Sequence, residues 1–399
     1  MSKQREFLYA STLAGFVVAA GCAADDPSGG TSAATDSAQG TDTLTTGDAT
    51  DGSGPSGSAS GSGPGSGSNT EPGESSESVD GSSGPSESSE TGDPPLPPTG
   101  LCGMAPPDGA QMPAPLPVYT GGTCPSLGPG LNAITSSGNA RTFHVVVPSD
   151  LQPGETLPVA FLWHWLGGSA TDFIEKADAQ NAVDQLRFIA IAPEEKGDLL
   201  FRWPFSAADS DARMQEEFVF FDDMLACVAE SYPIDNACVT SVGVSAGALF
   251  TSQLGWGRGD YLSSISVLSG GTGGLAKPWN GSPHIMPALV LWGGPDDNCA
   301  GLFSFVTTSQ NLESSLQADG HPVVECIHNC GHSEPPFTAP EGLTPYTGMW
   351  QFFLDHPFWL EDGETPWSTG TPEALPEWCA LGVGAATPRM GECENSSAC

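Results

Sequence analysis

The stretch ACVTSVGVSAGALFTSQLGWG (residues 237–257) predicts a strand, a tight turn and a helix in direct succession. Residues 237–242 are predicted to form a strand, and residues 247–257 are predicted to form a helix. Between them, GVSAG (243–247) fits the pattern G-x-S-x-G. The two glycines of this pattern are needed because side chains at their positions would collide with the strand and the helix, and the tight turn pushes the serine hydroxyl out above the sheet. The stretch therefore predicts a serine, Ser245, presented at the carboxyl end of a strand.

Buried strands and helices alternate on both sides of this stretch. Apolar runs predict strands at 141–148, 157–164, 187–193, 237–242, 261–268, 286–292 and 322–328, and intervening segments predict helices at 170–184, 212–231, 247–257, 301–318 and 343–355. Continuous apolar strands separated by helices are typical of a mostly parallel sheet covered on both faces. The sequence therefore predicts an α/β fold. The span from 269 to 286 is too short for a lid domain, and the Pro- and Cys-rich ends, 101–140 and 360–399, are expected to be irregular.

A serine hydroxyl becomes a nucleophile when a histidine accepts its proton and an acid holds that histidine. In this type of fold the acid and the histidine follow the serine in the chain. Two adjacent carboxylates, Asp296 and Asp297, follow the predicted strand 286–292, and His332 lies in a loop after the strand 322–328. His328 stands at the end of that strand, where a structural role is expected. The alternative for the GVSAG segment is an ordinary strand-to-helix turn, and for the acids a turn-forming pair.

Other histidines and a glycine-containing loop complete the candidate site. His284 and His321 precede strands and are expected at the opposite edge of the sheet. The backbone N–H of Ala246 and an N–H from the loop after the second strand are expected to stabilise an oxyanion. HWLGGS (164–169) lies in that loop and indicates Leu166 as the second donor, although its glycines also suit a plain turn.

Residues 141–355 resemble the polyhydroxybutyrate depolymerase-like and feruloyl or acetyl-xylan esterase-like branch of the α/β-hydrolases. Three segments carry the resemblance: HWLGGSATDF (164–173), EEFVFFDDMLACVAESYPIDNACVTSVGVSAG (216–247), and LVLWGGPDD (289–297) with GHSEPP (331–336). The resemblance implies an α/β-hydrolase fold and an esterase with the catalytic residues Ser245, Asp296 rather than Asp297, and His332. Two residues depart from the branch: Trp165 replaces a glycine beside the oxyanion loop, and Trp292 replaces a histidine, with an effect expected on packing only.

The first 22 residues resemble a bacterial lipoprotein signal. Lys3 and Arg5 precede a short apolar run, and small residues lead to Cys22, the expected site of lipidation. An ordinary secretory signal is the alternative; both imply export. Residues 23–100 contain 13 carboxylates but no aromatic residue, lysine or arginine, so we expect a disordered tether. Residues 101–399 are then the catalytic domain.

The chain has 48 Asp and Glu against 11 Lys and Arg, a formal net charge of −37 at pH 7. Such a charge repels phosphate backbones and anionic headgroups, which argues against nucleic-acid binding and against membrane contact other than through the lipid. Ten cysteines remain besides Cys22, and an even number in an exported protein indicates disulfides. Plausible local pairs are Cys102 with Cys124 and Cys227 with Cys238. Zinc bound by Cys326, Cys330 and His332 is the alternative.

Together these features predict an exported, lipid-anchored serine esterase that acts as a monomer on carboxylic esters of a polymer or of its fragments, without cofactor or metal. Two other functions remain open. A serine peptidase would use the same residues on an amide, and a non-catalytic surface-binding lipoprotein would retain only the scaffold. The unusual Trp165 motivates the second of these.

Overall fold

The computed structural model describes residues 100–299, 301 and 303–393. The predicted signal segment 1–22 with Cys22, and the predicted tether 23–100 apart from its last residue, lie outside the described residues. Within the described part, no helix has both the length and the apolar character needed to cross a membrane.

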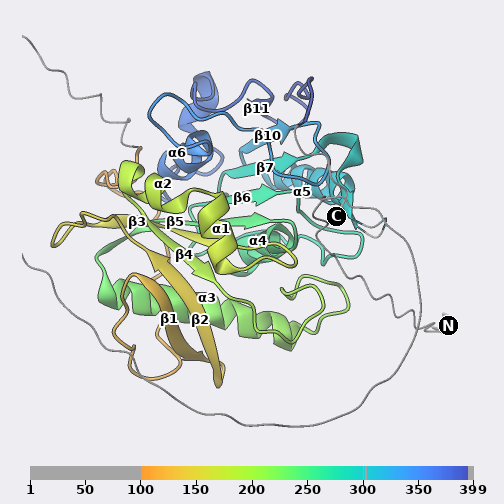
Figure 1. Cartoon of the computed structure of the whole chain (residues 1–399). Coiled ribbons are helices and arrows are strands. Elements are labelled where there is room, and N and C mark those ends of the chain that lie inside the picture. The colour runs from red at the N-terminus through yellow and green to blue at the C-terminus, as the bar shows by residue number, and fades with distance from the viewer. Residues whose placement is uncertain (1–99, 300, 302, 394–399) are drawn as a thin grey trace, which may run out of the picture. The chain divides into compact units, whose positions relative to one another are not determined.

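A nine-stranded sheet in the order β1-β2-β4-β3-β5-β6-β7-β10-β11 forms the centre of the domain (Figure 1). The six strands from β4 to β10 are mutually parallel, whereas β1, β2 and β11 add antiparallel edges. The strands are β1 (Gly130–Ser136), β2 (Asn139–Val146), β3 (Leu157–Trp163), β4 (Ile189–Pro193), β5 (Ile234–Val244), β6 (Ser264–Leu268), β7 (Ala288–Trp292), β10 (Val323–Ile327) and β11 (Cys379–Leu381). A short separate pair joins β8 (Asn298–Cys299) to β9 (Phe303–Ser304).

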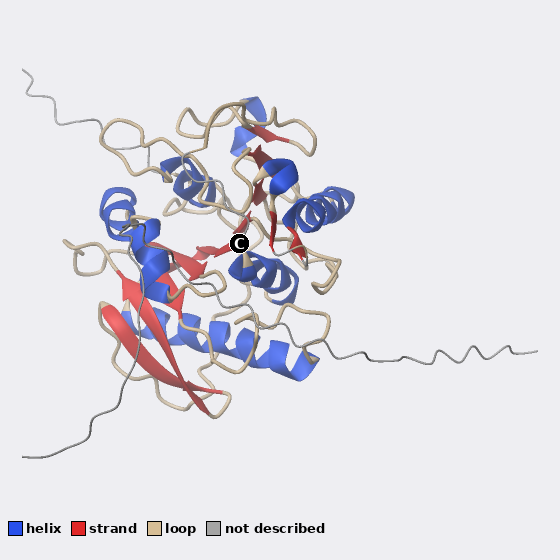
Figure 2. Cartoon of the chain, turned by 45° about the vertical axis from the view of Figure 1, so that its right-hand side comes forward, coloured by secondary structure: helices blue, strands red, loops and turns tan. Residues whose placement is uncertain are grey.

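Helices cover both faces of the sheet, as Figure 2 shows in blue beside the red strands. One apolar cluster joins the sheet to three helices, α3 (Asp211–Ser231), α4 (Ala246–Gly257) and α5 (Phe305–Asp319). A second cluster joins the opposite face to α1 (Ala170–Lys176), α2 (Ala179–Leu186) and α6 (Thr347–Leu354). Alternate residues of β3 divide between the two clusters, since Phe161 belongs to the first and Leu162 to the second. The predicted parallel sheet between two helical layers is confirmed.

Two local predictions differ from the structure. The expected helix 170–184 is two helices, because Asp178 adopts a left-handed φ of 48° and ends the first helical run. The ends of the domain are less irregular than expected. β1 pairs with β2 across a tight turn in which Ser137 and Gly138 both have positive φ, and β11 pairs with β10. Between β6 and β7, the described residues 269–287 contain no helix and no named strand, so no lid domain is inserted there.

Disulfides connect segments that are distant in the sequence. The expected local pairs are wrong: Cys102 bonds to Cys238 and Cys124 bonds to Cys227, across 136 and 103 residues. The reason is that the segment before β1 runs beside β5 and α3, which sequence spacing does not reveal. Two further disulfides join Cys326 to Cys379 and Cys330 to Cys393, and Cys299 is also disulfide-bonded. Thiolates of Cys326 and Cys330 are therefore not available as zinc ligands. Disulfides in this number are typical of proteins outside the cytoplasm.

Candidate active site

Ser245 occupies a strained turn between β5 and α4. Its backbone has φ 55° and ψ −115°, a conformation that non-glycine residues rarely adopt, and its N–H donates to the carbonyl of Leu268 at 2.9 Å. A β-carbon on Gly247 would lie 1.9 Å from the carbonyl oxygen of Trp163 in β3. Glycine at that position therefore lets the start of α4 pack directly against β3. This is the local reason that the chain can turn so tightly and hold the serine above the carboxyl edge of the sheet.

A hydrogen-bonded chain connects Ser245 to His332 and Asp297. His332 Nε2 lies 2.8 Å from Ser245 Oγ, and Nδ1 lies 2.7 Å from Asp297 Oδ1. A carboxylate can only accept, so Nδ1–H donates to Asp297 and the free Nε2 lone pair accepts from the serine hydroxyl. The side chain of Asp297 is fully buried and that of His332 is 10 % exposed. This arrangement can take a proton from a hydroxyl while the resulting imidazolium is stabilised by a carboxylate.

The prediction that Asp296 holds the histidine is wrong, because the carboxylate in contact with His332 Nδ1 is that of Asp297. After β7 the chain makes a single 3-10 turn, Gly294–Asp296, in which Gly294 has φ 76° and its carbonyl accepts from the Asp297 N–H. The turn directs Asp297 into the protein and leaves Asp296 exposed. The distance from Gly293 to the acid is thus one residue longer than the resemblance implied.

Three residues support Asp297 and His332, and sequence reasoning missed two of them, Ser269 and Phe305. Asp297 Oδ2 accepts from the hydroxyl of Ser269 at 2.8 Å and from the Gly293 N–H at 2.7 Å. The ring of Phe305 stacks on the His332 imidazole with centroids 4.1 Å apart and planes at 11°. Ser269 directly follows β6, so its place at the carboxyl edge was a signal available in the sequence. Phe305 gave no comparable signal, since a phenylalanine that begins a helix is usually part of the core.

The expected oxyanion donors come from two elements, the start of α4 and the turn after β3. Ala246 is the first residue of α4, and the first N–H groups of a helix have no partner within it. Leu166 lies in the turn after β3 that closes with a hydrogen bond from the Gly168 N–H to the Trp165 carbonyl. Trp165 does not have a positive φ, and its ring packs toward Gly168 and Phe173. The replacement of glycine by Trp165 therefore requires no left-handed backbone here. The donor roles of Ala246 and Leu166 stay predictions.

The buried histidines near the site have structural contacts. His328 accepts from the Cys330 N–H through Nδ1, and burial lowers the pKa of His328 to about 4. Burial likewise lowers the pKa of His164, whose Nδ1 lies 2.9 Å from the Trp165 carbonyl. Trp292, which replaces a histidine of the resembling branch, donates its indole N–H to Glu313 Oε1 at 3.2 Å. His284 and His321 precede β7 and β10, at the opposite edge from Ser245, as expected.

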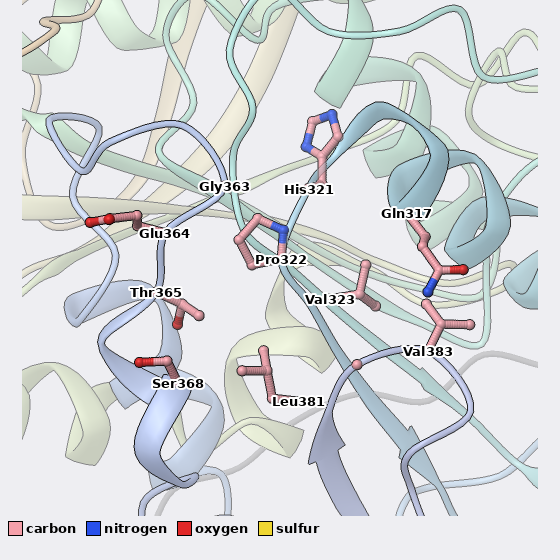
Figure 3. Close-up of a pocket in the computed structure, with 11 residues that line it drawn as sticks. Gln317, His321, Pro322, Val323, Gly363, Glu364, Thr365, Ser368, Leu381 and Val383 are labelled. Carbon is pink, nitrogen blue, oxygen red and sulfur yellow. The ribbon is translucent and has the colours of Figure 1, made fainter.

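A cavity of about 470 Å³ lies at that opposite edge (Figure 3). Its lining includes Pro322 and Val323 at the start of β10, and Gly363, Thr365 and Ser368 from the segment after α6. Since Ser245 and Asp297 follow the carboxyl ends of β5 and β7, this cavity is separate from the hydrogen-bonded chain, and we give it no part in that chemistry.

Comparison with known proteins relates the chain to esterases at low identity. No family model matches it. It is 25 % identical to feruloyl esterase B of Talaromyces funiculosus over 214 residues, which are 53 % of this chain and 52 % of that protein. Feruloyl esterase D of Neurospora crassa is 28 % identical over 37 % of the chain and 52 % of its own length. For feruloyl esterase C of Emericella nidulans the identity is 24 %, over 58 % of the chain and 89 % of that protein. The chain thus spans about half the length of the first two relatives.

Solved structures match a larger share of the chain than the curated relatives do. The native structure of pOPH superposes with a TM-score of 0.53 over 65 % of this chain and 97 % of its own, at 18 % identity. The native structure of sOPH gives a TM-score of 0.51 over the same shares. At this identity the likeness concerns the fold alone. The strand order, the turn at Ser245 and these superpositions agree: the chain has an α/β-hydrolase fold and is a distant, feruloyl esterase-like relative of known esterases.

Proposed function

We propose that this protein is an exported serine esterase that hydrolyses carboxylic esters of a polymer or of its fragments. The observation that carries the proposal is the hydrogen-bonded chain from Ser245 through His332 to Asp297, because its atoms have the contacts that acyl transfer requires. The names of the curated relatives support an ester rather than an amide as the substrate.

In the proposed reaction, Ser245 Oγ attacks the ester carbonyl carbon while His332 Nε2 accepts the hydroxyl proton. The carbonyl oxygen becomes an oxyanion, for which the N–H groups of Ala246 and Leu166 are the expected donors. The tetrahedral intermediate collapses, the bond to the alcohol oxygen breaks, and His332 returns the proton to that oxygen. Water then attacks the acyl-enzyme by the same route and releases the acid and Ser245. Asp297 keeps its charge throughout and stabilises the imidazolium.

The proposed substrate class is broader than a single ester. The segment between β6 and β7 inserts no lid over the carboxyl edge of the sheet. This edge is compatible with feruloyl or acetyl esters of a polysaccharide and with an aliphatic polyester of the hydroxyalkanoate type. The proposed lipid on Cys22 and the proposed tether 23–100 would let the domain reach a large substrate away from the membrane. We expect the protein to act as a monomer.

The test is fluorophosphonate labelling of the full-length oxidised protein, followed by location of the label by mass spectrometry. Such a probe reacts with an activated serine, so we expect one label, on Ser245. Ser245→Ala should abolish labelling and lower ester turnover on the order of 10⁴-fold or more. Ser252→Ala is a matched control, because Ser252 is a buried serine of α4 whose hydroxyl bonds to the Ala248 carbonyl.

A folded wild-type protein that takes no label would overturn the esterase proposal and favour a non-catalytic binding protein. A parallel panel of feruloyl, acetyl and 3-hydroxybutyrate esters, with matched amides, separates the remaining possibilities. Turnover of the amides at rates comparable to the esters would indicate a peptidase instead.

A further inference from the structure

The loop that carries His332 is short and is held from two sides. It begins where β10 ends and reaches the histidine within five residues, His328 to His332. The first support is the end of β7 and the residue after it, which lead on to Asp297. His328 N–H donates to the Trp292 carbonyl, and Gly331 N–H donates to the Gly293 carbonyl, each at 3.0 Å. The two backbones approach so closely that a β-carbon on Gly293 would lie 1.8 Å from the Gly331 oxygen.

The second support comes from the C-terminal segment, residues 386–393. The N–H of Arg389 donates to the Ile327 carbonyl at 2.9 Å, at the end of β10. The Arg389 guanidinium donates to Asn329 Oδ1 at 2.6 Å, and the Asn329 amide donates in return to the Gly391 carbonyl at 2.7 Å. Cys330 is bonded covalently to Cys393. The end of β10 at Ile327 and the loop residues Asn329 and Cys330 are thus fixed to a segment about 60 residues away in the sequence.

Arg389 differs from the other cations of the described residues. The other eight, Arg141, Lys176, Arg187, Lys196, Arg202, Arg213, Arg258 and Lys277, each pair with a described carboxylate. Arg389 instead directs its N–H groups at neutral acceptors, Asn329 Oδ1 and the Glu392 carbonyl at 3.1 Å. A guanidinium offers several donors in one rigid plane, so it can join the loop and the C-terminal segment at the same time.

We propose that Arg389 is a positioning residue for His332. This inference rests on the proposed function, since it concerns the geometry of the same histidine. Arg389 does not touch Ser245 or His332. Its backbone N–H holds Ile327, and its guanidinium holds Asn329 and through it the path of the loop. The imidazole must meet Ser245 on one side and Asp297 on the other, so a displacement of the loop weakens both hydrogen bonds together. A shift of about 1 Å in such a group lowers the rate on the order of 100-fold.

The experiment compares Arg389→Gln and Arg389→Lys with the wild type, as full-length oxidised proteins. Fluorophosphonate stoichiometry counts the competent sites, and kcat is then expressed per labelled site. We expect Arg389→Gln to keep full labelling and a KM within about 2-fold, while kcat per site falls about 10- to 100-fold. Arg389→Lys should recover part of the rate, because it retains one donor for Asn329. A merely structural role would lower the labelled fraction and leave kcat per site unchanged, and that result would overturn the proposal.

Arg258→Gln is the matched control. Arg258 makes a bidentate pair with Asp222 at 2.7 Å for both bonds, away from the histidine loop. An equal loss of kcat per site in Arg258→Gln would contradict a specific role of Arg389. If Arg389→Gln does not fold, the double variant Cys330→Ser/Cys393→Ser tests the same attachment. Its control is Cys124→Ser/Cys227→Ser, which removes a disulfide between the N-terminal segment and α3.

We expect kcat per site to fall in the first pair and to stay unchanged in the second; equal values in both pairs would overturn the proposal. Failure of the proposed function looks different, since the wild type itself would then remain unlabelled and inactive.

Discussion

Asp296 and Asp297 are adjacent and chemically identical, yet the fold gives them opposite environments. Asp297 is buried and its two oxygens accept from His332, Ser269 and Gly293, whereas Asp296 is exposed. We therefore predict that Asp297→Asn lowers kcat/KM on the order of 10³- to 10⁴-fold, because an amide no longer stabilises the imidazolium or fixes its tautomer. Asp296→Asn should change it less than about 3-fold, as surface substitutions do. Ester hydrolysis by the two variants, side by side, measures the difference, and a larger loss in Asp296→Asn would refute the assignment.

Glu313 is a second residue whose environment sets its behaviour. It is buried in the core, where it accepts from the Trp292 indole, and burial raises the pKa of Glu313 to about 8. The neighbouring carboxylate of Glu325 adds to that increase. In the unfolded chain the group titrates near its ordinary pKa. Between the ordinary pKa and about 8, the unfolded chain has lost the proton while the folded protein keeps it. The free energy of unfolding therefore falls as pH rises through this window.

We predict that Glu313→Gln removes this pH dependence while keeping an acceptor for Trp292. The variant should match the wild type near pH 4.5 and exceed its unfolding free energy by about 3–5 kcal/mol near pH 8. Denaturant unfolding at several pH values measures this, with Glu373→Gln as an exposed control. If the free energy of unfolding depends on pH equally in Glu313→Gln and in the wild type, folding does not raise the pKa of Glu313 and the prediction is wrong.

At the residue scale, the sequence leads to the right contact where a motif fixes position and to the wrong one where a single turn decides, while the catalytic roles stay predictions. Ser245 and His332 were identified from their place after strands, and the structure brings them into contact. The choice between the two aspartates was wrong because it depends on the φ of Gly294, which no pattern of residue types reveals. Ser269 and Phe305 were missed because their roles arise from contacts between segments distant in the sequence.

At the scale of elements, the junction of β3, β5 and α4 sets the geometry of the serine. A β-carbon on Gly247 would meet the Trp163 and His164 carbonyl oxygens at 1.9 and 2.7 Å, and backbone atoms cannot rotate away. We predict that Gly247→Ala forces α4 away from β3, lowers stability by about 1–3 kcal/mol and reduces activity more than the unfolded fraction explains. The Gly128→Ala variant is the control, because a β-carbon there meets nothing within 4 Å. Thermal unfolding with labelling stoichiometry tests both, and a fully active Gly247→Ala would contradict the close packing.

Element prediction succeeded for the buried parallel strands and failed at the periphery. β3, β4 and β7 read as continuous apolar runs because both of their faces are covered, so the pattern is strong. β1 is half exposed and β11 has three residues, and both depend on an antiparallel partner for their conformation. The same non-local dependence explains the disulfides, since the distance between Cys102 and Cys238 is a property of the folded chain.

At the scale of the whole molecule, charge is the dominant property. Residues 101–399 contain 34 Asp and Glu but only 9 Lys and Arg. Eight of these cations pair with carboxylates of the described residues, among them Lys176 with Glu334 and Arg202 with Glu195. Asp296 is exposed next to the site. Among the described residues, Arg389 is the one lysine or arginine that is not paired with a described carboxylate. Its guanidinium donates to Asn329 of the histidine loop and to the Glu392 carbonyl.

This charge predicts a preference for neutral over anionic esters, with a characteristic salt dependence. A negative field slows the approach of an anionic substrate, and salt screens that field, since the Debye length falls from about 30 Å at 0.01 M to about 3 Å at 1 M. We expect kcat/KM for mono-p-nitrophenyl succinate to rise several-fold over this range. The value for p-nitrophenyl acetate, which shares the leaving group but is neutral, should change less than about 2-fold. A cationic ester of the same alcohol should show the opposite trend. Equal salt responses of the succinate and acetate esters would mean that the field of the domain does not reach the reacting serine.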